Sequence, residues 1–348
     1  MSYTLGQLVD CPNIQRKLSD RFALAPVNEF MPFFEFVTSP INNRGLSQEI
    51  NPGGGKIRTV TLTYTPRQLE SAVAENVANP KCDVSNFVGN NFTNYEIDTT
   101  ENLQWGFSMT RTDLEAACEA NEMYFADRLM DAVDVLDRAL ATKHTNDVFA
   151  NIGKWASNVT VNGSNEFEVA TELPSSAIID PQTHAKIKFA LQKTGFSAQT
   201  FIFSGNTLAE YYRATLDGCC SEQGIDVSGI FSRYGTAVAY DRRIESGFAD
   251  SNKALAVQAG SLTLLQYTAT PWRSGLRPAI EGANYFQTVI TSPRTGVNMD
   301  LTVSDDCGQV SVSLVATTKL ATLPMDMFRQ GDFMQGVNYL AKIKVVNS

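Results

Sequence analysis

A narrow stripe of apolar residues runs along the chain between residues 112 and 152. No proline or glycine occurs in this range, and the apolar residues recur at spacings of three, four or seven. Such spacings place them on one face of a helix. Thr112 and Glu115 match a capping box, which puts the helix start near Thr112. We predict one helix, roughly 55 Å long at a rise of 1.5 Å per residue, that buries Leu114, Cys118, Phe125, Leu129, Ala132, Leu136 and Leu140.

The opposite side of this predicted helix carries an arc of acidic residues. Carboxylates four residues apart share a helix face and are the ligand type that hard cations prefer. A solvated surface explains the same spacing more simply, and we predict no metal site. Asp137 belongs to the same arc. The predicted acidic face consists of Glu115, Glu119, Glu122, Asp127, Asp131 and Asp134.

Two runs of alternating apolar and polar residues predict a long β loop over residues 53–110. The first run is Lys56–Thr65 and the second is Leu103–Met109. A glycine-rich hinge, Pro52–Gly55, precedes the first run and lacks the Lys-Ser/Thr ending of a phosphate-binding loop. Isolated hairpins are marginal in water, so we expect this loop to rest on another surface.

The rest of the pattern predicts an α+β fold. Residues 1–52 combine aromatic clusters with recurring prolines, typical of an arm that lies on its own core or on a neighbouring subunit. Residues 111–173 hold the long helix and a connection, 174–270 form an α/β domain, and 271–348 return to β structure. In 174–270 we also predict a strand at Ala177–Ile179 and helices at Pro181–Lys193 and Thr207–Leu216. The strands that we predict from residue 200 onward are Thr200–Phe203, Thr236–Tyr240, Leu255–Gln258, Leu262–Gln266, Phe286–Thr291, Val297–Val303, Val310–Thr317 and Tyr339–Val345.

Composition narrows the function classes. A net charge of -9 argues against a protein that holds nucleic acid by neutralising phosphates. The only histidines are His144 and His184, no zinc-type spacing occurs, and Ser204 lacks the glycine pattern of a nucleophile elbow. We therefore predict no catalytic residue, no cofactor and no metal. An enzyme built on residues 174–270 is the rival interpretation from a different class.

Cysteine use and hydropathy indicate a cytoplasmic setting. The cysteines are scattered without a CxxC motif, so we expect reduced thiols at Cys11, Cys82, Cys118, Cys219, Cys220 and Cys307. No apolar stretch is long enough to span a membrane, and no signal peptide pattern opens the chain.

The order of the predicted parts carries a resemblance. An arm, a glycine hinge, a long β loop, a spine helix, an α/β domain and final strands follow one another. This order resembles the tailed-phage major capsid protein of the Hong Kong 97 type. In that family the arm and an extended loop (E-loop) embrace neighbours, a peripheral domain (P-domain) holds the spine helix and a sheet, and an axial domain (A-domain) surrounds the ring axis.

The resemblance implies self-assembly. We expect hexamers and pentamers that form an icosahedral shell around double-stranded DNA, in a virion assembled in a bacterial cytoplasm. Scaffold, portal and decoration proteins are further expected partners, with weak non-specific contact with DNA and no membrane. The acidic arc is then expected to face the shell interior. Intersubunit contacts are expected at Phe30, Phe33, Phe34, Lys56, Arg58, Arg67, Trp105, Arg242, Arg243 and Trp272. The alternatives are an encapsulin-like nanocompartment shell and a phage tail or decoration protein.

Overall fold

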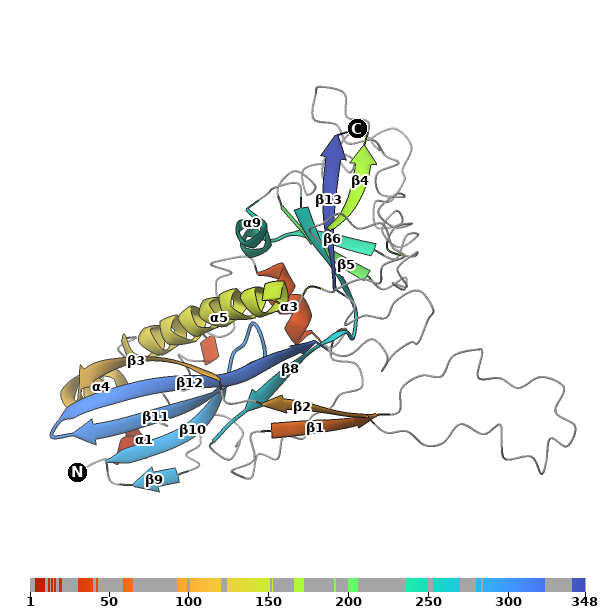
Figure 1. Cartoon of the computed structure of the whole chain (residues 1–348). Coiled ribbons are helices and arrows are strands. Elements are labelled where there is room, and N and C mark those ends of the chain that lie inside the picture. Colours follow the sequence, from red (N-terminus) through yellow and green to blue (C-terminus); the bar gives the residue numbers. More distant parts are fainter. Residues whose placement is uncertain are drawn as a thin grey trace, which may run out of the picture. The chain divides into compact units, whose positions relative to one another are not determined.

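Alternating apolar residues build a six-stranded sheet in the computed structural model of this chain (Figure 1). Neighbouring strands follow the order β3-β12-β11-β10-β9, and β8 pairs with β12. Every pair along this path is antiparallel. The strands are β3 (Asn102–Thr110), β8 (Leu262–Tyr267), β9 (Ile280–Gly282), β10 (Tyr285–Thr291), β11 (Asn298–Asp306) and β12 (Gln309–Thr322).

The chain divides into two units that alternate along the sequence. The first unit contains residues 1–60, 97–144 and 264–321, and the second contains 61–96, 145–263 and 322–348. The structure describes residues 4–9, 31–39, 59–64, 93–98, 101–119, 124–150, 166–171, 200–205, 236–249, 253–269, 280–282, 284–322 and 340–347, and positions 12, 14, 16, 19, 20, 42, 152 and 191.

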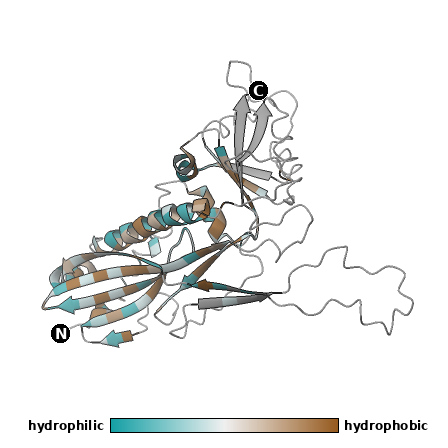
Figure 2. Ribbon diagram, in the orientation of Figure 1, coloured by the Kyte–Doolittle hydropathy of each residue, from teal (hydrophilic) through white to brown (hydrophobic). Residues whose placement is uncertain are grey.

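One face of the six-stranded sheet forms the core of the first unit. The register places Phe286 opposite Val303 and Val312 opposite Phe107, all on the same face. Because side chains alternate between faces, this face collects the apolar residues and the other collects Ser, Thr and Gln. The alternation is visible along β11 and β12 in Figure 2.

Two helices follow β3. Helix α4 spans Arg111–Glu119 and α5 spans Tyr124–Ala150, which is 27 residues. The predicted helix is confirmed over 111–119 and 124–150. Residues 120–123 lie outside the described ranges, so its continuity through them stays a prediction. The predicted N-cap at Thr112 is wrong by two residues, because Thr110 caps the helix. Thr110 and Asp113 form the capping box: the Thr110 amide donates to Asp113 Oδ2 at 3.2 Å, and the Asp113 amide donates to Thr110 Oγ1 at 3.2 Å.

The two-arm loop has a different second arm from the one predicted. β1 (Thr59–Tyr64) pairs with β2 (Thr93–Asp98) in a two-stranded sheet. The run Leu103–Met109 is β3, which pairs with β12 along its whole length. Alternation marks both segments as half-buried strands, but it does not identify the pairing partner, and the long strand β12 is the partner of β3.

The second unit contains a five-stranded mixed sheet in the order β4-β13-β7-β5-β6. Its strands are β4 (Glu166–Thr171), β5 (Thr200–Ser204), β6 (Thr236–Tyr240), β7 (Lys253–Gln258) and β13 (Leu340–Asn347), and helix α9 (Arg242–Phe248) lies between β6 and β7 in the sequence. β13 is the last of the strands predicted after residue 271, and it belongs to this second sheet. This strand pairs with β7 antiparallel and with β4 parallel.

The sequence located the strands better than it paired them. Every strand predicted from residue 200 onward is present, with ends displaced by a few residues. The strand predicted at Ala177–Ile179 and the helix predicted at Thr207–Leu216 lie outside the described residues. Of the helix predicted at Pro181–Lys193, only Leu191 is described, in a helical conformation.

Two short helices belong to the N-terminal segment. Helix α1 (Leu5–Val9) packs on α4, β9, β10 and β11, and α3 is Pro32–Thr38. Leu5 and Leu8 are fully buried, so this part of the predicted arm rests on its own unit. The expectation of reduced thiols is wrong for Cys118, which is disulfide-bonded. Its partner lies outside the described residues, because the other described cysteine, Cys307, is free.

Candidate functional site

The apolar stripe of α4 and α5 packs as predicted, except that Cys118 is only half-buried. Leu114, Phe125, Leu129, Ala132, Leu136 and Leu140 are all at most 2% exposed. The rings of Phe125 on α5 and Phe107 on β3 lie 6.2 Å apart at an interplanar angle of 60°. The long helix therefore packs on the apolar face of the six-stranded sheet through residues that the sequence predicted to be buried.

The acidic face is partly neutralised by basic residues of the same helices. Asp127 and Asp131 are exposed, and Asp134 pairs with Arg138 at 3.1 Å. Glu115 pairs with Arg111, also at 3.1 Å. The side chains of Glu119 and Glu122 lie outside the described residues. The exposed acidic surface that remains is thus centred on the first half of α5.

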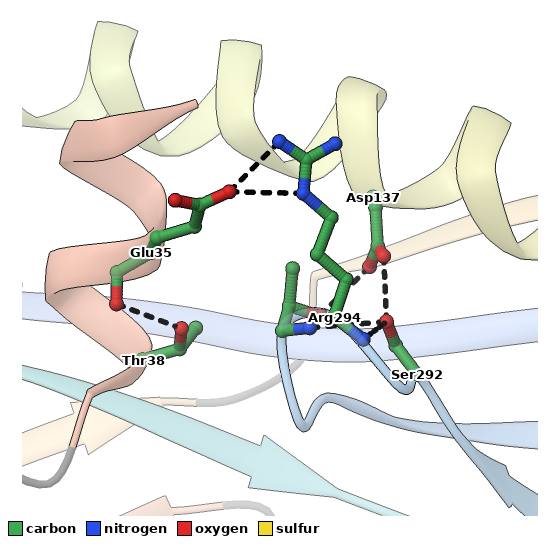
Figure 3. A network of polar contacts seen from close by, with 6 residues as sticks. Glu35, Thr38, Asp137, Ser292 and Arg294 are labelled. Carbon is green, nitrogen blue, oxygen red and sulfur yellow. Dashed lines mark hydrogen bonds and ion pairs between the residues drawn. The ribbon is translucent and has the colours of Figure 1, made fainter. Parts of the chain in front are cut away.

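Asp137 does not belong to that exposed surface. Its side chain is 2% exposed and accepts hydrogen bonds from two hydroxyls of the β10–β11 turn: Ser292 at 2.6 Å and Thr295 at 2.9 Å (Figure 3). Burial raises the pKa of Asp137 to about 6. The two hydrogen bonds and Arg294 act in the opposite direction, and nearby Asp134 adds to the rise. The expectation that Asp137 sits on a solvated face is wrong, because the turn between β10 and β11 covers it.

The same turn holds α3. The guanidinium of Arg294 donates from Nε and Nη2 to Glu35 Oε1, at 2.9 and 2.8 Å (Figure 3). The amides of Arg294 and Thr295 donate to the Ser292 hydroxyl oxygen, which shapes the turn. A single turn therefore contacts the long helix through Asp137 and the N-terminal segment through Glu35.

Two predicted intersubunit residues lie inside the first unit. Phe33 and Phe34 are 0% and 1% exposed. The Phe34 ring stacks on His144 of α5, with centroids 5.9 Å apart, and His144 Nε2 lies 2.8 Å from Thr318 Oγ1 of β12. The prediction that Phe33 and Phe34 contact a neighbour is wrong, because these rings fill their own core. His144 is a buried packing residue of this core.

A second polar cluster lies where the chain passes from β2 to β3. Glu101 accepts from Lys143 of α5 and from Lys319 of β12, each at 2.6 Å. Hydrogen bonds from Lys143 and then Lys319 lower the pKa of Glu101 to about 2, against the effect of burial. This carboxylate is therefore ionised at neutral pH.

The other predicted contact residues are distributed over both units. Trp105 on β3 is half-buried beside Phe107, with ring centroids 6.1 Å apart. Arg242 is exposed and Arg243 half-buried in the first turn of α9, whose start is capped by the Asp241 carboxylate. These three remain predictions as subunit contacts. Phe30, Lys56, Arg58, Arg67, Trp272 and the other histidine, His184, lie outside the described residues.

Sequence reasoning missed the two polar clusters and α9. Asp137 and Glu101 find partners more than 150 positions away, and no local pattern encodes such pairs. The cap of α9 had a signal, because Asp241 directly precedes Arg242 and a carboxylate there accepts from the amides of Arg243 and Ile244.

In the part of the chain that the structure describes, no group of three or more His, Cys, Asp or Glu side chains is placed to hold a metal ion. No helix among those same residues has the length and hydropathy needed to cross a bilayer.

Comparison with known proteins gives no family model and no curated protein that matches this chain. Solved structures do match. The mature capsid of bacteriophage PhiM1 is 10% identical, with 84% of this chain and 83% of that chain covered and a TM-score of 0.44. The capsid of Myoviridae phage XM1 is 8% identical, with 85% and 88% covered and a TM-score of 0.42. A virus-like particle from Pyrococcus furiosus is 10% identical, with 82% and 86% covered and a TM-score of 0.35.

Proposed function

We propose that this chain is a major capsid protein with the Hong Kong 97-type architecture, which builds a closed icosahedral shell around double-stranded DNA. The observation that carries the proposal is a long helix fastened lengthwise to an antiparallel sheet, preceded by a two-stranded β loop and followed by a second, mixed sheet. In this assignment the first unit is the P-domain, the second contains the A-domain, and β1–β2 is the base of the E-loop.

The packing of the first unit suits the rigid part of a shell subunit. Its long helix buries a continuous apolar stripe and is tied to the sheet again by the Asp137 and His144 contacts. The helix and the sheet form one rigid unit, because separating them would expose the apolar residues that each buries against the other. A shell subunit needs a rigid body and a segment that contacts a neighbouring subunit. The β1–β2 loop is the proposed contacting segment.

Assembly is the direct test. The purified chain, alone and with candidate scaffold proteins from its own genome, would be followed by size-exclusion chromatography and electron microscopy. We expect hollow closed shells of uniform size, formed from hexamers and pentamers. A chain that stays monomeric under all these conditions would contradict the proposal. Mass spectrometry of particle contents separates the two shell functions, since a docked cargo enzyme instead of DNA would favour a nanocompartment.

We propose that the exposed acidic surface of α5 faces the packaged genome. Like charges repel across a short distance, so the carboxylates would keep DNA from adhering to the wall. Replacing Asp127, Asp131 and Asp134 with Asn should change genome retention in particles more than shell yield. Asp306→Asn, at an exposed position at the end of β11, serves as the control. Loss of shells by a normally folded triple variant would instead make this surface a subunit interface.

A further inference from the structure

The root of the β1–β2 loop is held by one carboxylate shared between two ammonium groups. β2 ends at Asp98 and β3 begins at Asn102, so Glu101 stands at the point where the chain enters the six-stranded sheet. Each of its oxygens has a separate partner: Oε2 lies 2.6 Å from Lys143 Nζ and Oε1 lies 2.6 Å from Lys319 Nζ. One residue thereby connects the loop root to α5 and to β12.

Packing around Lys143 and Lys319 holds both partners of Glu101 in place, so the two ion pairs form a bridge with fixed ends. Lys143 and Lys319 neighbour His144 and Thr318, which form their own contact at 2.8 Å inside the core. Asn102, the residue after Glu101, is paired with Thr317 in the sheet register. The two lysines are therefore carried by positions that packing already holds.

The bridge is too exposed to matter mainly for stability. The side chain of Glu101 is 41% exposed, and those of Lys143 and Lys319 are 23% and 31% exposed. Ion pairs at such positions contribute little to the free energy of folding, because water screens them. Their geometric effect is larger, since two partners on two different elements fix both oxygens of one carboxylate.

We propose that Glu101 is a positioning residue for assembly, which fixes the root of the β1–β2 loop so that the loop is held ready for a second copy of this chain. The inference rests on the proposed function of a shell subunit. Its physical reason is entropic: a loop whose root is fixed before association loses less conformational freedom on binding.

The test compares Glu101→Gln with the natural chain. Glutamine keeps the shape of the side chain and removes its charge. We expect the critical concentration for shell assembly, measured by light scattering, to rise by about tenfold, because each backbone residue ordered only on association weakens it by roughly that factor. The midpoint of thermal unfolding of the unassembled subunit should shift by no more than about 4 °C. Arg138→Gln, which breaks the partly exposed pair with Asp134 on α5, is the matched control and should leave assembly unchanged.

A charge reversal distinguishes positioning from general destabilisation. The triple variant Glu101→Lys, Lys143→Glu and Lys319→Glu restores two ion pairs of opposite sign and should recover assembly. A wild-type critical concentration for Glu101→Gln, or a folded triple variant that assembles no better than Glu101→Gln, would overturn the inference. If the natural chain never assembles, the proposed function fails, and limited proteolysis of subunits still decides about Glu101. Faster cleavage near residues 93–101 in Glu101→Gln supports the fixed root, and an unchanged rate refutes it.

Discussion

Replacing Asp137 with asparagine removes a buried ionisable group and should change how stability depends on pH. In the folded chain the pKa of Asp137 is raised from 3.8 to about 6, chiefly because burial disfavours the charged carboxylate. At 1.36 kcal/mol per pH unit, this difference corresponds to about 3 kcal/mol. The sign follows from proton binding. Between pH 3.8 and about 6 the folded chain holds this proton more tightly than the unfolded chain, so stability from this group falls as pH rises through that window.

Asparagine carries no charge at any of these pH values. The stability of Asp137→Asn, measured as its free energy of unfolding minus that of the natural chain, should therefore rise by about 2.4 kcal/mol between pH 4 and pH 7. Asparagine keeps one oxygen that can accept from Ser292 or Thr295, and any hydrogen bond that it loses adds a constant offset. The pH-dependent difference is independent of that offset.

The assay is urea denaturation of unassembled subunits, monitored by circular dichroism at intervals from pH 4 to pH 8. Asp131→Asn is the matched control, because it removes an exposed carboxylate from the same helix. The control should follow the natural chain across this range. Parallel stability curves for Asp137→Asn and the natural chain would refute the reasoning, because they would show that Asp137 binds its proton equally in both states.

Two further substitutions test local geometry in each unit. Gly247→Ala places a Cβ 2.1 Å from the Phe149 ring, so the ring must leave its edge-on contact with Phe248, and we expect a loss of about 1–2 kcal/mol in urea denaturation. Ser246→Ala, at the exposed neighbouring position, should change stability by less than about 0.5 kcal/mol, and an equal effect would contradict the steric argument. Cys307→Asn should stabilise by about 0.5–1 kcal/mol, since Cys307 has a φ of 53° in a two-residue turn where Asn is favoured. No gain with Asn, or the same gain with Ala, would count against this account.

The long helix and most strands of the chain followed from local pattern, whereas the short helices did not. The stripe from Leu114 to Leu140 is buried as its spacing required, because a helix repeats every 3.6 residues wherever it lies. Strands such as β10, β11 and β12 stand where alternation placed them. These features depend on neighbours within a few positions, and the sequence contains that information directly.

Strand pairing was beyond the local pattern. The runs at β1 and β3 look alike, yet β1 pairs with β2 and β3 pairs with β12. Alternation states that one face of a strand is buried, without stating which other strand lies beside it. For the same reason the sequence did not identify the partners of β13, since β7 and β4 are remote in sequence.

Burial of individual side chains shows the same division. The apolar rings of Phe33 and Phe34 predicted that both residues would be buried. Only the fold shows that they are buried by His144 and the core of their own unit. The position of Asp137 in the helical repeat predicts an exposed carboxylate, but a turn about 155 positions later covers it. The sequence by itself determined the amphipathic spine, most strands and the acidic surface, because these follow from short-range periodicity. The tertiary structure alone decided which strands pair, which acids are buried and where Glu101 holds the loop root, because those outcomes depend on contacts between segments that the chain brings together only on folding.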